Sequence, residues 1–135
     1  MVTTLGEISR ESAKRFGDKT ALIIEDKSFS YKEIDAMACR VANGLKASGV
    51  RPGDRVTLYS ANCWEWAVSY HAIAKTGAVI NPINVMLTSD EVKYVVEDSG
   101  TTAVLGSADK AESLLDLKGN NELKELVLFG DTVPT

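Results

Sequence analysis

The amino-acid sequence predicts an α/β fold in which a mainly parallel sheet is flanked by helices on both faces. From residue 31 onward, segments with the apolar period of a helix alternate with short apolar runs that suit buried strands. The connections between these segments are only a few residues long. Because parallel strands need a helical crossover between them, this order favours a parallel sheet covered on both sides.

The first 30 residues predict a helix followed by a small β-hairpin. Residues 4–16 have helical periodicity, with Thr4 in position to cap the N-terminus and Gly17 in position to end the helix. Its apolar stripe is Leu5, Ile8, Ser12 and Phe16. The hairpin has a strand over residues 20–25, a polar turn at residues 26–27 and a return strand through Phe29.

A second helix is predicted to begin at Tyr31. Ser30 and Glu33 have the spacing of a capping box, in which each side chain bonds the backbone N–H of the other residue. Gly49 would end this helix. The residues expected to be buried are Ile34, Met37, Ala38, Val41 and Leu45.

The third helix, over residues 63–76, is apolar almost all round, which predicts burial between two layers. Asn62 is in position to cap it and Gly77 to end it. Two strands flank this helix, one over residues 55–59 after a turn at Pro52 and Gly53, and one that begins at Ala78.

A fourth helix follows a second capping box, formed by Thr88 and Glu91, and closes at Gly100. It is expected to bury Val92, Val95 and Val96. The remaining elements are a strand over residues 101–105, a shorter helix over residues 111–117 and a strand over residues 125–129. The segment GDTVPT then closes the sequence as a loop.

The composition is that of an ordinary globular domain. The 135 residues are 44% hydrophobic and 25% charged, and 15 basic against 19 acidic side chains give a formal net charge of -4. An acidic surface repels phosphate backbones, so nucleic acid is a poor candidate partner. The longest apolar runs fall far short of the roughly 20 residues that span a bilayer. The N-terminus also lacks the apolar stretch of a signal peptide, so we expect a cytoplasmic protein.

The two cysteines, Cys39 and Cys63, lie far apart without CxxC spacing, and the chain has a single histidine. They are expected to be buried free thiols rather than a disulfide or a metal site. No metal-binding residue is therefore predicted in this segment.

The stretch DSGTTAVLG, residues 98–106, resembles the Ser/Thr/Gly-rich loops that grip phosphates. Such a loop must run from a strand into a helix, so that backbone N–H groups and the positive end of the helix dipole meet the anion. Here a helix precedes Gly100 and a strand follows it, so carbonyl groups lie beside the glycine. The sequence also lacks GxxxxGK[ST] and GxG. A helix stop is the favoured interpretation.

Three residues of the third helix are candidates for chemistry. His71 lacks a matched acid or nucleophile in the sequence, so we interpret it as a hydrogen-bonded core residue and not as a catalyst. Trp64 and Trp66 could stack a base or an acyl chain, but packing is the favoured role. No catalytic or cofactor-binding residue is predicted in this segment.

The carboxylate pairs and the segment VINPIN also have structural interpretations. Residues 90–91 and 97–98 lie in the first and last turns of a helix, where capping and solvation explain paired acids. Pro82 cannot donate to a sheet, so its strand must end there or run at an edge. Asn81 and Asn84 are expected to fix the strand exit by hydrogen bonds, although ligands also bind at such strand ends.

Four segments together resemble the adenylate-forming superfamily of enzymes. FSYKEI (29–34) and AIAKTGAVINPIN (72–84) are similar to its first two core motifs. Between and after them, GVRPGDRVTLYSANCWEW (49–66) and LTSDEVKYVVEDSGTTAVL (87–105) are similar to its intervening segments. The resemblance covers residues 5–129, and PINVML is most similar to fatty-acid or aryl-acid:CoA ligases.

The resemblance implies a reaction in which ATP and a carboxylic acid give an acyl adenylate and pyrophosphate, after which the thiol of coenzyme A takes the acyl group. ATP, Mg²⁺ and coenzyme A are therefore implied for a full-length parent, and none is implied for this segment. The family's phosphate loop, magnesium-binding glutamate and lid lysine would all follow residue 135. Residues 1–135 are thus expected to be the first part of the large N-terminal domain, truncated before the phosphate loop.

Such a segment is expected to have no ligase activity alone, and to associate with itself or with the rest of its fold through an exposed apolar face. One alternative is a free-standing α/β binding or scaffolding module that kept the fold without the chemistry. A flavodoxin-like or dinucleotide-binding domain is disfavoured because the glycine-rich turn from strand to helix is missing.

Overall fold

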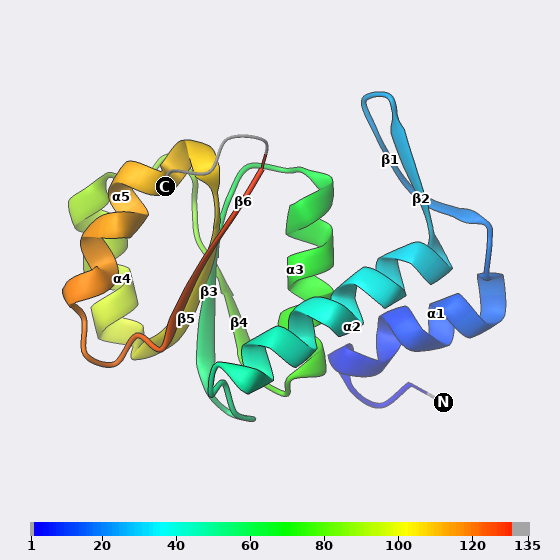
Figure 1. Cartoon of the computed structure of the whole chain (residues 1–135), viewed down its shortest axis with the longest axis horizontal. Coiled ribbons are helices and arrows are strands. Elements are labelled where there is room, and N and C mark those ends of the chain that lie inside the picture. The colour runs from blue at the N-terminus through cyan, green and yellow to red at the C-terminus, as the bar shows by residue number, and fades with distance from the viewer. Residues whose placement is uncertain (1, 131–135) are drawn as a thin grey trace.

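A four-stranded parallel sheet forms the centre of the structure (Figure 1). The computed structural model describes residues 2–130. The strands lie in the order β4, β3, β5, β6, and each neighbouring pair is parallel. Their bounds are Arg55–Tyr59 for β3, Val79–Pro82 for β4, Thr101–Ser107 for β5 and Glu125–Phe129 for β6. The predicted fold class is confirmed.

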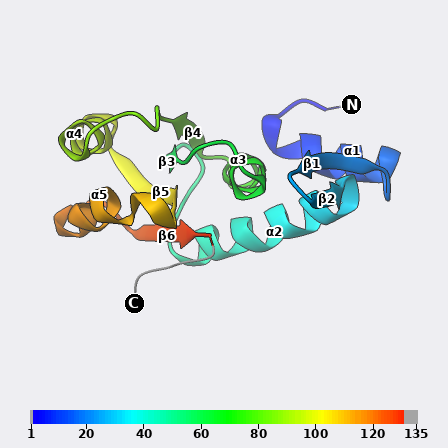
Figure 2. The same ribbon diagram turned by 90° about the horizontal axis from the view of Figure 1, so that it is seen from above.

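Helices cover both faces of this sheet. The α-helices are α1 (Ile8–Phe16), α2 (Tyr31–Ala47), α3 (Trp64–Lys75), α4 (Ser89–Ser99) and α5 (Ala111–Leu115). Short 3-10 turns are η1 (Leu5–Glu7), η2 (Ala108–Lys110) and η3 (Asp116–Gly119). Seen from above, α2 and α3 lie on one side of the sheet and α4 and α5 on the other (Figure 2). The segment from η2 to η3 replaces the single helix predicted over residues 111–117.

The central strand β3 is buried on both faces. Val56 and Leu58 lie in a core cluster with Ile73 of α3, while Tyr59 lies in a second cluster with Val96 of α4. Since successive side chains of a strand point to opposite faces, each face of β3 contributes to a different core. This explains why a strand without apolar-polar alternation sits at the centre of the sheet.

A third core cluster joins α2 to α3 and reaches the hairpin. Its buried members are Ile34, Ala38, Ala42, Val68 and Ala72. The alanines let the two helices approach closely, and Leu22 and Phe29 of the hairpin pack against them. The hairpin consists of the antiparallel strands β1 (Thr20–Ile24) and β2 (Lys27–Ser30) and projects from the top of α2 (Figure 1). Its turn lies at residues 25–26, one position earlier than predicted, with Glu25 at a φ of 55°.

The two predicted capping boxes are confirmed. Ser30 Oγ accepts from the Glu33 N–H at 3.0 Å, and the Glu33 carboxylate accepts from the Ser30 N–H at 3.3 Å. Thr88 and Glu91 make the same exchange at 3.3 and 2.7 Å. Each box supplies partners to backbone donors that the first helical turn leaves free.

Two predicted N-caps are wrong. Thr4 makes no capping hydrogen bond, because the chain enters a 3-10 turn whose Glu7 carboxylate accepts instead from the Thr3 N–H at 2.8 Å. Asn62 lies one position too early, because the chain stays extended through Cys63, which occupies the N-cap position of α3 without a side-chain hydrogen bond. The first helix is also less buried than its stripe predicts, since Leu5 is 54% exposed.

Within residues 2–130, no helix combines the length and the apolar character needed to cross a bilayer. The final loop, apart from Gly130, lies outside the described residues.

We expect Gly106→Ala in β5 to lower the free energy of unfolding by about 1–3 kcal/mol, the usual cost of overpacking a core. A Cβ atom there would lie 2.3 Å from Leu114 Cδ1 and 3.0 Å from the Tyr59 carbonyl oxygen. Gly44→Ala is the matched control, because a Cβ at this exposed position of α2 meets no atom within 4 Å. It should stabilise the protein by about 0.5–1 kcal/mol. Urea unfolding of both variants measures the difference, and equal effects would contradict the close packing of α5 on β5.

Candidate functional site

The carboxyl ends of β3 and β5 form the candidate site. In open parallel sheets, ligands bind beyond the strand ends where the helices that follow two neighbouring strands lie on opposite faces. β3 and β5 are such neighbours, because α3 follows β3 on one face and α5 follows β5 on the other (Figure 2). Residues just beyond Tyr59 and Gly106 are therefore the ones to inspect.

Small neutral groups line these strand ends. Ser60 is buried, and its hydroxyl donates to the Ala61 carbonyl oxygen at 2.8 Å and lies 3.5 Å from Cys63 Sγ. Across the junction, Ser107 Oγ is buried and finds no hydrogen-bond partner among the described residues. A buried hydroxyl without a partner costs free energy, so Ser107 marks a position where a further group would be accommodated favourably.

Tyr59 fastens the loop that follows β4 to the end of β3. Its hydroxyl donates to the Leu87 carbonyl oxygen at 2.9 Å, and Lys110 Nζ lies 5.7 Å from the centre of its ring. Burial raises the pKa of Tyr59, and the negative charges of Asp109 and Glu91 raise it further. The phenol therefore stays protonated at neutral pH and acts as a structural donor.

The stretch from Asp98 to Gly106 runs from helix to strand, as predicted. α4 ends at Ser99, and Gly100 adopts a left-handed conformation with a φ of 66°, its N–H bonded to the last carbonyls of the helix. Thr101 is fully buried, and its Oγ1 lies 2.7 Å from both Thr57 Oγ1 and Ser99 Oγ. The Thr101 hydroxyl therefore bonds within the sheet, and Gly100 is a helix stop.

His71 departs from its predicted role. It lies among apolar side chains of α3, but its Nδ1 is buried and has no partner within the described part of the chain. Burial lowers the pKa of His71, the charge of Lys75 lowers it further, and Asp35 acts in the opposite direction. A hydrogen-bonded core histidine was the wrong prediction, because α2 and the hairpin supply no polar atom at this ring nitrogen.

The two tryptophans pack as predicted. Trp64 stacks on Phe29 of the hairpin with ring centroids 5.2 Å apart, and Trp66 stacks on Tyr70 one turn along α3 at 5.5 Å. Both rings lie against core clusters of the protein. They anchor the start of α3 to its surroundings.

The segment VINPIN is held by side-chain hydrogen bonds, as expected. Asn81 Nδ2 donates to Thr57 Oγ1 at 3.1 Å, and Asn84 Oδ1 accepts from the Met86 N–H at 2.8 Å. Pro82 both ends β4 and lies in an edge strand of the sheet. The strand exit is thus fixed from both sides.

The remaining candidates have structural positions. The side chains of Asp90, Glu91, Glu97 and Asp98 are all exposed, in the first and last turns of α4. Cys39 and Cys63 are free, but both are half-buried rather than buried. Among the described residues, no group of three or more histidine, cysteine and acidic side chains is placed to hold a metal ion.

An ion pair between α2 and α3 has no signal in the sequence. Lys75 Nζ lies 2.7 Å from Asp35 Oδ1, and Ser9 of α1 donates to the same oxygen at 2.8 Å. Burial raises the pKa of Asp35, but the hydrogen bonds from Lys75 and Ser9 and the positive charge of Lys75 outweigh it, so the net shift is downward. Because 40 residues separate the partners, only the packing of the helices brings them together.

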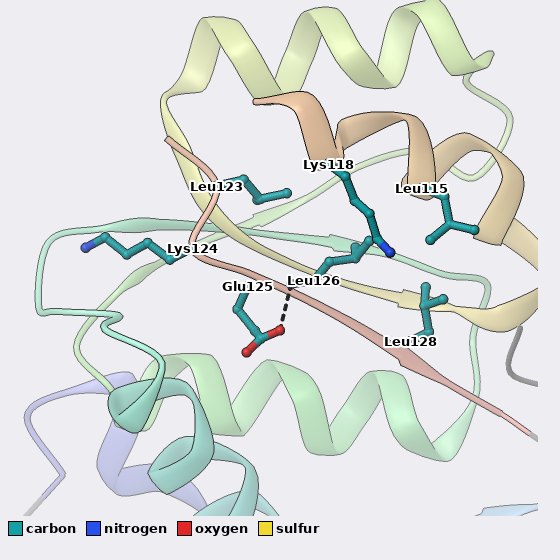
Figure 3. Close-up of a pocket in the computed structure, with 7 residues that line it drawn as sticks. All are labelled: Leu115, Lys118, Leu123, Lys124, Glu125, Leu126 and Leu128. Atoms are coloured by element: carbon teal, nitrogen blue, oxygen red, sulfur yellow. Dashed lines mark hydrogen bonds between the residues drawn. The ribbon is translucent and has the colours of Figure 1, made fainter. Parts of the chain in front are cut away.

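A groove lies along the outer side of β6, with a volume of about 440 Å³ (Figure 3). We call it the leucine groove; its lining residues are Leu115, Lys118, Leu123, Lys124, Glu125, Leu126 and Leu128. The leucine side chains of α5 and β6 point toward one another across it (Figure 3). Since β6 is the last strand in the sheet order, the groove lies beside a free strand edge.

Comparison with known proteins gives a consistent result. The family model described as AMP-binding enzyme matches residues 9–134. A crotonobetaine/carnitine--CoA ligase from Salmonella paratyphi A is 33% identical over 129 residues, covering 90% of this chain and 25% of the relative. The chain therefore spans about a quarter of the length of the curated relatives it matches.

Solved structures share the fold. A candidate long-chain-fatty-acid CoA ligase from Rhodopseudomonas palustris CGA009 superposes with a TM-score of 0.89 and 31% identity, covering 98% of this chain and 34% of that one. An anthranilate CoA ligase solved with anthranoyl-AMP gives a TM-score of 0.88 and 27% identity, covering 95% of this chain and 25% of that one. The superposed parts are portions of larger proteins.

We expect Asp35→Asn to lower the free energy of unfolding by about 1–3 kcal/mol at pH 7, because Lys75 and Ser9 lose a charged acceptor. The folded pKa of Asp35 lies below its usual value of 3.8, so its contribution is full above that pH and is lost as the pH falls through the folded pKa. Urea unfolding at a series of pH values should show wild type and variant converging at the acid end.

The control for this experiment is Glu11→Gln, which removes an exposed pair with Lys14 on α1. It should change stability little at any pH, since exposed pairs contribute about 0–1 kcal/mol. A constant difference between wild type and Asp35→Asn from pH 7 to pH 2 would contradict the assignment of the shifted carboxyl.

Proposed function

The chain belongs to the AMP-binding enzyme family, and from this membership we propose that residues 1–135 form the first part of the large N-terminal domain of an AMP-forming acid:CoA ligase. In this proposal they supply structural framework and have no ligase activity alone. The parent enzyme would join a carboxylic acid to coenzyme A with ATP and Mg²⁺. A fatty acid or an aryl acid is the proposed substrate class.

The observation that carries the proposal is the coverage of the matches. Nearly the whole chain matches, but it spans about a quarter of each curated relative. The named relatives are CoA ligases, among them enzymes named for a fatty acid and for anthranilate. These names support the reaction class and the proposed breadth of acids.

The chemistry of the described residues supports a framework role. Adenylation requires groups that stabilise the charge of a triphosphate. Beyond β3 and β5 the chain places the neutral groups of Ser60, Cys63 and Ser107, and the Thr101 hydroxyl is bonded within the sheet. These residues would fix the sheet on which a catalytic loop from elsewhere in the parent is mounted.

The leucine groove supports a second part of the proposal, that the isolated chain associates through this face. Leu115 is half-buried but belongs to none of the three core clusters. In a parent protein, further secondary structure beside β6 would cover these leucines. In the isolated chain, a second copy is the available cover.

The purified 135-residue chain is expected to catalyse no acid-dependent exchange of labelled pyrophosphate into ATP. A full-length crotonobetaine/carnitine--CoA ligase assayed with its own acid provides the positive control. A panel of fatty and aryl acids covers the proposed substrate class. Exchange above the blank with any acid, lost on removal of that acid, would show that the segment is active and overturn the framework role.

Light scattering is expected to show a molar mass above 14.6 kDa that rises with protein concentration. Leu115→Lys should shift the chain toward monomer, because it places a charge in the leucine groove without removing a core residue. Ile23→Lys is the matched control, since Ile23 is 71% exposed on the hairpin, far from the groove. A monomer at high concentration, or equal association of both variants, would contradict the proposal.

A further inference from the structure

A cavity of about 200 Å³ lies between α1, β1, α2 and α3, on the side of the molecule away from β6 (Figure 2). Its apolar wall includes Ile8, Leu22, Ile34 and Ala67. These residues come from four different elements, so the cavity exists only where the hairpin and α1 close over the α2–α3 pair. The site beyond β3 and β5 shares none of them.

Four polar side chains also line this cavity. They are Ser9, Ser12, Tyr31 and His71. The Ser9 hydroxyl hydrogen is already committed to Asp35 at 2.8 Å. His71 differs from it, because its Nδ1 is buried without a hydrogen-bond partner among the described residues. The cavity therefore presents an apolar volume with one unsatisfied ring nitrogen in its wall.

Water alone fills such a space poorly. At about 30 Å³ each, several water molecules would be needed, and each requires two to four polar partners. The apolar wall offers few partners, so most of these molecules would lose hydrogen bonds. A single aromatic ring suits the volume better, since cavities of about 150 Å³ with apolar walls accept benzene.

The geometry points to a ligand site: we propose that this cavity binds a small single-ring aromatic molecule bearing a hydroxyl group, with the ring against the apolar wall and the hydroxyl bonded to His71 Nδ1. A hydroxyl suits this nitrogen in either neutral tautomer, because it can donate to a bare Nδ1 or accept from a protonated one. The lowered pKa of His71 keeps the ring neutral at pH 7. The proposal is independent of the ligase assignment.

Phenol and toluene are matched probes, since they differ by the hydroxyl. Each is titrated into the 135-residue chain at pH 7 and followed by amide chemical shifts. Phenol is expected to bind about 3–10-fold more tightly than toluene, the value of one hydrogen bond. Intermolecular nuclear Overhauser effects from the phenol ring to Leu22 and Ile34 methyls locate it. Overhauser effects only to other residues, or no binding of either probe, would mean that the cavity holds water alone and overturn the proposal.

Two variants separate the ring from the nitrogen. His71→Phe keeps an aromatic ring of similar size and removes Nδ1, so phenol and toluene should bind equally well. Ala67→Leu fills the cavity from α3 and should abolish the binding of both. Circular dichroism confirms that each variant is folded, and the Overhauser measurement on the wild type needs neither. A preference for phenol that survives His71→Phe would remove His71 from the site and overturn the proposal.

Discussion

Helix α3 has to be buried on two sides, and the rest of the structure follows from this constraint. One side packs on β3 through Ile73, and the other packs on α2 through Ala72, so the helix separates two cores. Its polar groups must then be satisfied by neighbours or remain costly. Lys75 meets this requirement by pairing with Asp35, whereas the His71 ring nitrogen lacks a partner among the described residues.

Much of the fold could be predicted from the sequence because its signals are local. The capping box of Ser30 and Glu33, the stop at Gly100 and the restriction imposed by Pro82 each depend on a few consecutive residues. N-caps without such a box were missed, as at Asn62, because one residue of extra extended backbone moves the cap. The candidate site was less predictable, since the exposure of Ser107 Oγ depends on which elements pack around it.

Polar residues that suggest a binding site in sequence can instead hold a sheet together. Asn81, Thr57, Thr101 and Ser99 form one chain of hydrogen bonds across three strands and the end of α4. Buried hydroxyls and amides that satisfy one another in this way fix the relative positions of their strands. The sequence shows the residue types but not their partners, and the partners decide between a ligand site and a structural network.

The two edges of the sheet differ in a way that limits how copies of the chain can join. The Val79 N–H donates to Asp54 and the Ile83 N–H donates to Leu58, both on the β3 side. By the alternation of a strand, the nitrogen of Pro82 faces outward, and proline has no hydrogen to donate. Only the β6 edge keeps a full set of outward donors, so strand pairing between copies is self-complementary and closes after two members. A head-to-tail filament, which needs both edges, is disfavoured by the backbone itself.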